Sequence, residues 1–186
     1  MVKFFIGFLT AAVLISLALF CYVRFGFVDP RADIDPGSME MRIAMPALDA
    51  SVDRRASDTK NPVQSTEENL QSGMKIYQST CSGCHGDISH PHAAFGDSFY
   101  PRAPQFVEDA PDMTDSQNFY IIKHGVRLSG MPAWGKTLED TEIWNVTTFL
   151  SNMNKLPPRV SDRWKAASGQ HESTAIEADP NNAVKK

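Results

Sequence analysis

Residues 79–90 read STCSGCHGDISH and place two cysteines and a histidine, Cys81, Cys84 and His85, within five positions. The chain has 186 residues and only one other cysteine, Cys21, which lies in an apolar run far from the pair. Three cysteines are too few for a disulfide scaffold. The pattern therefore indicates a site for a cofactor, a metal ion or redox chemistry, and the rest of the chain decides between these.

C-x-x-C-H is the attachment signature of c-type haem, in which two thiols bond the porphyrin and the adjacent imidazole binds its iron. A zinc site would need further Cys or His ligands at tight spacing. His90 and His92 lie nearby, but the chain has no second CxxC and no HxxxH. A thioredoxin-like CxxC would open a helix after a strand, and no strand is predicted here. The motif alone leaves all three readings open.

A second pattern, HGVRLSGMPAWG at residues 124–135, favours haem. Met131 lies there between Gly130 and Pro132, 46 residues after His85. A haem iron with one histidine needs a sixth ligand for fast electron transfer, and a thioether in a loop suits that role.

Three helices are predicted around these motifs, and no segment alternates with the period of a strand. The first begins at Ser65, where Ser65 and Glu68 have capping-box spacing, and ends near the cysteine pair. The second covers residues 115–125 and stops at Gly125. The third covers residues 139–153, with apolar residues at helical spacing. An all-α fold follows.

Residues 66–156 resemble the class I cytochromes c, in particular the small bacterial, membrane-anchored mono-haem type. The resemblance rests on Gly73 and Tyr77 in the first helix, on CSGCHG, and on IIKHGVRLSGMPAW. It implies a haem domain of three to four helices. It also implies one haem c, bound covalently by Cys81 and Cys84, with His85 and Met131 as the axial iron ligands.

The same resemblance suggests roles for residues around the haem. The segment FYPRAPQF, residues 99–106, matches a proline-containing loop whose backbone carbonyl, near Pro101 or Pro104, would orient the His85 ring. The candidates for the haem pocket or its propionates are Tyr100, Arg102 and Trp134. His90 and His92 remain rival sixth ligands, because the loop that carries them matches no pattern of the family.

Residues 4–23 form a run of twenty residues without a formal charge, long enough to cross a bilayer as a helix. A cleaved signal peptide and a lipid anchor on Cys21 are the alternatives. No small-x-small cleavage site follows the run, however, and the bulky Phe20 precedes Cys21. An uncleaved single-pass anchor is expected. The resemblance implies a bacterial inner membrane with the haem domain on the periplasmic side.

The expected organisation has four parts. Residues 1–24 form the transmembrane anchor, 25–64 an extended tether, 65–156 the mono-haem domain, and 157–186 a partly disordered tail. Residues 25–64 are rich in Pro, Asp, Ser and Arg. Apolar residues do not recur there with the period of a helix or a strand, so little of the segment can bury a core. Pro157 and Pro158 are expected to stop a helix. Trp164 is expected to fold back on the domain, with docking on a partner as the alternative.

The charge balance, 22 acidic against 18 basic residues, argues against a general nucleic-acid binder. Residues 116–138 nevertheless contain Lys123, Arg127 and Lys136 and no acidic residue, which suggests a basic rim for docking. A haem with two protein ligands has no open position for a small-molecule substrate. The expected function is single-electron transfer rather than catalysis, with a quinol-oxidising complex, oxidase, reductase or dehydrogenase as partner. The alternatives are a fixed subunit of a larger membrane oxidoreductase and, less favoured, a haem sensor or peroxidase-like protein.

Overall fold

The computed structural model describes residues 1–56 and 58–177, with side chains described as far as residue 168. The chain divides into two compact units, Met1–Arg31 and Ala32–Lys186. The first contains helix α1, Val2–Arg24, whose mean hydropathy of 2.5 and length of 23 residues are sufficient to cross a membrane. At 1.5 Å per residue the helix is about 35 Å long, against a hydrocarbon core of about 30 Å. Helix α1 fits a single-pass membrane anchor.

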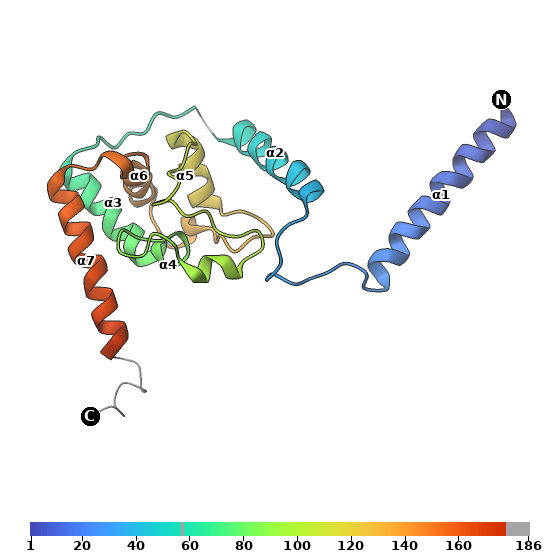
Figure 1. The fold of residues 1–186 in the computed structure, drawn as a ribbon. Coiled ribbons are helices and arrows are strands. Elements are labelled where there is room, and N and C mark those ends of the chain that lie inside the picture. Colours follow the sequence, from blue (N-terminus) through green and yellow to red (C-terminus); the bar gives the residue numbers. More distant parts are fainter. Residues whose placement is uncertain (57, 178–186) are drawn as a thin grey trace, which may run out of the picture. The chain divides into compact units, whose positions relative to one another are not determined.

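The second unit is built on the crossing of α3, Glu67–Thr80, and α6, Asp140–Ser151 (Figure 1). Gly73 allows the close approach, because a Cβ there would lie 2.1 Å from the carbonyl oxygen of Asn145. Tyr77 packs against Phe149 beside this crossing, with the two rings tilted by 50°, and both side chains are fully buried. Gly73 and Tyr77, two of the residues that carry the family resemblance, thus lie against α6.

Helix α5, Asp115–His124, packs on α6 and confirms the predicted second helix. Thr114 and Gln117 form a capping box at its start, which satisfies backbone N–H groups that the helix itself cannot pair. Gly125 ends it with φ +68°, a conformation that glycine adopts without steric cost. The first helix also forms, but Thr66, one residue after the predicted Ser65, provides its cap.

The remaining short elements are helical turns within the connections between and after these helices. They are the single turn α4, Ser82–His85, and the 3₁₀ turns η1, Ala94–Ser98, η2, Trp134–Lys136, and η3, Met153–Lys155. All regular structure in the described part of the chain is helical. The all-α fold with an N-terminal apolar helix is confirmed.

The C-terminal segment differs from the tail predicted after the two prolines. Pro158 is the first residue of helix α7, Pro158–Glu177, which packs along α3 (Figure 1). Proline is favoured at the first position of a helix because its missing N–H would be unpaired there anyway. Val160 and Trp164 are buried in the core, so the expectation that Trp164 folds back is confirmed. Residues 178–186 of the expected disordered tail lie outside the described residues.

The predicted tether, residues 25–64, is also not extended throughout, because Ser38–Arg55 forms helix α2. Its Val52 is buried against the rest of the second unit, and α2 contacts α5. The helix tolerates Pro46, and its first half is exposed on all sides, which explains why no apolar period marks it in the sequence. A single buried residue, Val52, is too little for the sequence pattern to indicate a helix.

Candidate haem-binding site

The two cysteines and the histidine lie on a single tight turn that leaves the core helix α3. Cys81 ends α3 and is also the cap of α4, so the chain turns within one residue. Gly86 then leaves the turn with φ +78°, and a Cβ there would lie 2.3 Å from the carbonyl oxygen of Pro91. The buried Tyr77 hydroxyl donates to the carbonyls of Gly86 at 2.7 Å and His85 at 3.2 Å. The core residue Tyr77 therefore fixes the position of the turn.

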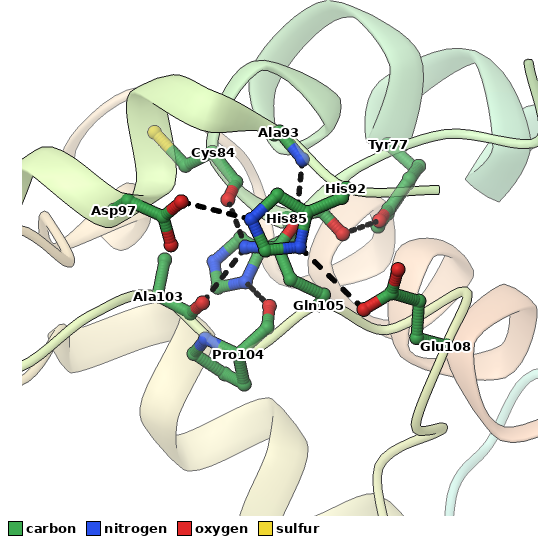
Figure 2. A network of polar contacts seen from close by, with 10 residues as sticks. All are labelled: Tyr77, Cys84, His85, His92, Ala93, Asp97, Ala103, Pro104, Gln105 and Glu108. Atoms are coloured by element: carbon green, nitrogen blue, oxygen red, sulfur yellow. Dashed lines mark hydrogen bonds and ion pairs between the residues drawn. The ribbon is translucent and has the colours of Figure 1, made fainter. Parts of the chain in front are cut away.

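The His85 ring has a fixed orientation. Its Nδ1 lies 2.8 Å from the carbonyl oxygen of Pro104 (Figure 2). A carbonyl can only accept, so Nδ1 carries the hydrogen and Nε2 keeps its lone pair. Burial lowers the pKa of His85 and so favours the neutral imidazole that binds metals. The ring of Phe106 stacks on it, with centroids 4.4 Å apart.

Neither Cys81 nor Cys84 forms a disulfide. Cys81 is buried, and its Sγ lies 3.3 Å from the Thr80 hydroxyl. Burial raises the pKa of Cys81 to about 11 and also raises that of Cys84. The pair follows helix α3, whereas the CxxC of a thioredoxin-like site follows a strand.

The loop that carries Met131 is closed by its own hydrogen bonds. Val126 N–H donates to the Met131 carbonyl at 3.2 Å, and Met131 N–H donates to the Ser129 hydroxyl at 3.1 Å. A Cβ on Gly130 would lie 2.3 Å from the Phe99 ring, so the loop backbone packs directly on that aromatic. Met131 is half-buried and packs against the core.

Residues 68–150 match the family model described as cytochrome c oxidase, cbb3-type, subunit III. The match is consistent with a c-type cytochrome domain in these residues. A search of curated proteins finds no match to the chain. A cytochrome c domain implies a covalently bound haem c.

The donor set of the cytochrome domain fits this cofactor. Cys81 and Cys84 are not used in a disulfide and have the spacing of a haem attachment motif. His85 presents a neutral ring with Nε2 open for iron, and Met131 supplies a soft thioether from a closed loop. In the parts of the chain that are described, no group of three or more His, Cys, Asp or Glu residues could hold a metal ion. The zinc reading of the motif thus gains no support.

The two histidines considered as rival ligands have other partners in the cytochrome domain. His92 lies between two carboxylates, with Nε2 2.8 Å from Asp97 and Nδ1 3.5 Å from Glu108 (Figure 2). His90 lies beside Asp87, with its Nδ1 3.8 Å from a carboxylate oxygen. Both histidines are exposed.

The three residues predicted to line the haem pocket or bind its propionates, Trp134, Tyr100 and Arg102, differ in their burial and in their contacts. Trp134 begins η2, is half-buried and packs against the core. The Tyr100 hydroxyl donates to Glu40 of α2, and the exposed Arg102 pairs with Asp35 at 3.0 Å. Their predicted roles at the haem stay predictions. Gln105 and Phe106 also contact the cysteine turn. Neither is predicted from the FYPRAPQF segment, because only the prolines in it match a pattern of the family.

Proposed function

We propose that the chain is a membrane-anchored, mono-haem c-type cytochrome that transfers single electrons between respiratory protein partners. Residues 1–24 would be the anchor and residues 65–156 the haem domain, on the periplasmic side of a bacterial inner membrane. In this proposal Cys81 and Cys84 bind the haem covalently, and His85 and Met131 hold its iron. The observation that carries it is the oriented His85 ring, in which the hydrogen bond of Nδ1 to the Pro104 carbonyl leaves the lone pair on Nε2.

The residues of the site suit electron transfer better than catalysis. When bound, haem c supplies an iron that changes between ferrous and ferric states. His85 and Met131 would occupy both axial positions and so exclude an exogenous ligand. The Pro104 carbonyl and the stacked Phe106 hold His85 in one orientation, so little rearrangement accompanies a change of charge. The half-buried Met131 lies in a loop that its own hydrogen bonds close.

Attachment is tested by a pyridine haemochrome assay on the purified full chain, which should find one covalent haem per protein. Haem that acidic acetone extracts would contradict the proposal. Cys81→Ser and Cys84→Ser should each leave little holoprotein, whereas Cys21→Ser should leave the yield unchanged, because Cys21 lies outside the haem domain.

Axial ligation is tested by the long-wavelength methionine-to-iron absorption band of the ferric protein. Met131→His should abolish the band and lower the reduction potential strongly, because a thioether favours ferrous iron relative to an imidazole. Met74→Leu, a change in the core, should keep the band. A Met131→Ala protein with the band and potential of the native one would show that another residue is the ligand, and His90→Ala and His92→Ala would then test the two rivals.

A second candidate function is a fixed, haem-bearing subunit of a larger membrane oxidoreductase. The matched family is named for a subunit of an oxidase. In addition, α2 is held against the domain through Val52 and the Tyr100–Glu40 hydrogen bond, which leaves less free chain than a shuttle would use. Mild detergent extraction and affinity purification with the anchor intact distinguish the two. Recovery of stoichiometric catalytic subunits selects the fixed subunit, and recovery of the cytochrome alone selects the shuttle.

A further inference from the structure

Gln105 makes three hydrogen bonds with a single side-chain amide (Figure 2). Its Oε1 accepts from the Ala93 backbone N–H at 2.8 Å, and its Nε2 donates to the carbonyls of Cys84 at 3.1 Å and Ala103 at 2.8 Å. A backbone N–H can only donate and a carbonyl can only accept, so these partners determine the orientation of the amide. Gln105 therefore connects the cysteine turn to two other segments of the loop.

Three consecutive residues, Pro104, Gln105 and Phe106, each bind the turn that carries the cysteines and His85. The Pro104 carbonyl lies 2.8 Å from Nδ1 of His85, and the Phe106 N–H donates to the His85 carbonyl at 3.1 Å. Between them, the Gln105 side chain binds the Cys84 carbonyl, which is one of the carbonyls left unpaired at the end of a short helix. The position of the Pro104 carbonyl relative to the His85 ring thus depends on contacts made on both sides of it.

The backbone of η1 closes over the Gln105 contact. A Cβ on Gly96 would lie 2.2 Å from the Cys84 carbonyl oxygen and 2.9 Å from Nε2 of Gln105. Gly96 is buried, and its carbonyl accepts from Ala103 N–H at 3.0 Å. The amide is thus enclosed between η1 and the cysteine turn, a setting in which its hydrogen bonds are expected to be strong.

We propose that Gln105 is a positioning residue for His85: it fixes the Pro104 carbonyl against Nδ1 and so sets the reduction potential of the haem. The inference rests on the proposed function, in which His85 binds the haem iron. A hydrogen bond from Nδ1–H to a carbonyl increases the basicity of a ligating imidazole. A more basic ligand stabilises the ferric state, so weakening this bond raises the potential.

The test compares Gln105→Met with Gln71→Met in the detergent-solubilised full chain. Methionine approximates the length and volume of glutamine and removes its hydrogen bonds. Gln71 lies on α3 and hydrogen-bonds to Arg163 of α7, so its replacement also removes a side-chain hydrogen bond, but away from the cysteine turn. The measurements are the reduction potential and, by NMR of the ferrous protein, the hydrogen-exchange rate of His85 Nδ1–H.

Gln105→Met should raise the ferrous-to-ferric ratio at a fixed ambient potential about threefold, which is about 28 mV at 59 mV per tenfold change. It should also accelerate exchange at Nδ1, while Gln71→Met changes neither quantity. A Gln105→Met protein with native potential and native exchange overturns the inference, even if its thermal stability falls. If Gln105→Met does not mature, Gln105→Asn decides, because its shorter amide cannot hold all three partners; it too must raise both quantities.

The native protein separates this inference from the proposed function. If the native chain lacks covalent haem, or if its spectrum excludes His85 as an iron ligand, the proposed function fails and the inference fails with it. If native His85 binds the iron and the Gln105 variants still behave as native, only the inference fails.

Discussion

At the scale of single residues, Tyr77 connects the cysteine turn to the core, because its hydroxyl hydrogen-bonds to two carbonyls of that turn. Replacing it by Phe leaves the Gly86 and His85 carbonyls without this donor, and a buried acceptor without a partner costs about 1–3 kcal/mol. Tyr77→Phe should lower the free energy of unfolding of the holoprotein by that amount, measured by guanidinium titration. Tyr120→Phe, at a half-buried position where the ring packs on His124, should change it by less than about 0.5 kcal/mol. Equal losses in the two variants would contradict this role of the Tyr77 hydroxyl.

The protonation of His92 is expected to make the stability of the fold depend on pH. The hydrogen bond to Asp97, and next the one to Glu108, raises the pKa of His92 above its ordinary value. A histidine with a raised pKa stabilises the fold fully below about pH 6.5, and the contribution is lost as pH rises through the folded-state pKa. Asp97→Asn should lower the pKa of His92 in an NMR titration of the ferrous protein, and Glu108→Gln should lower it less. An unchanged value in Asp97→Asn would show that the ion pair is absent in solution.

At the scale of elements, the segments with strong local signals are the ones that the sequence predicts. The cysteine motif, the closed methionine loop and the helices on either side of them form as expected, because each combines a spacing rule with a cap or a stop. Helix α7 is not predicted, because two consecutive prolines, Pro157 and Pro158, indicate the end of a helix as readily as the start of one. Gln105 has no local signal at all, because its three partners come from separate segments.

Helix α7 is part of the core, and this gives a prediction for Trp164. Its ring packs edge-on against Tyr77 and Phe149 and is 1% exposed. Trp164→Ala should lower the free energy of unfolding by about 3–5 kcal/mol, because the cavity adds to the lost burial. Trp164→Phe should cost clearly less, since Nε1 has no hydrogen-bond partner among the described residues. A loss below about 1 kcal/mol in Trp164→Ala would mean that α7 does not stabilise the domain.

At the scale of the whole molecule, the basic rim predicted from the sequence is altered by one ion pair. Lys123 binds Asp140 at 2.7 Å, so this pair carries no net charge, while Arg127 and Lys136 remain exposed. The docking proposal therefore rests on Arg127 and Lys136, beside the methionine loop of a chain that is acidic overall. A local positive field increases the association rate with anions and is screened by salt.

Oxidation of the ferrous protein by hexacyanoferrate(III), a small anion, measures this local field. Raising the salt from about 10 to about 200 mM should slow the reaction, because the Debye length falls from about 30 Å to below about 10 Å. Arg127→Gln with Lys136→Gln should slow it at low salt and flatten the salt dependence. Lys123→Gln with Asp140→Asn removes a neutral pair and should leave the rate unchanged. A native rate that increases with salt would show that the overall negative charge governs association.

Asp35 and Glu40 are bound to Arg102 and Tyr100 of the haem domain, and this limits how far the domain can travel. Only residues 25–34 then separate the end of α1 from the first of these contacts, and ten extended residues reach about 36 Å. Forty free residues would reach about 140 Å. If the domain is confined to a hemisphere around its anchor with a radius of about 36 Å, its effective concentration there is on the order of 10 mM. A radius of about 140 Å would give an effective concentration of only a few tenths of 1 mM. At any moment, electron exchange would then be limited to partners whose docking sites lie within about 36 Å of the anchor.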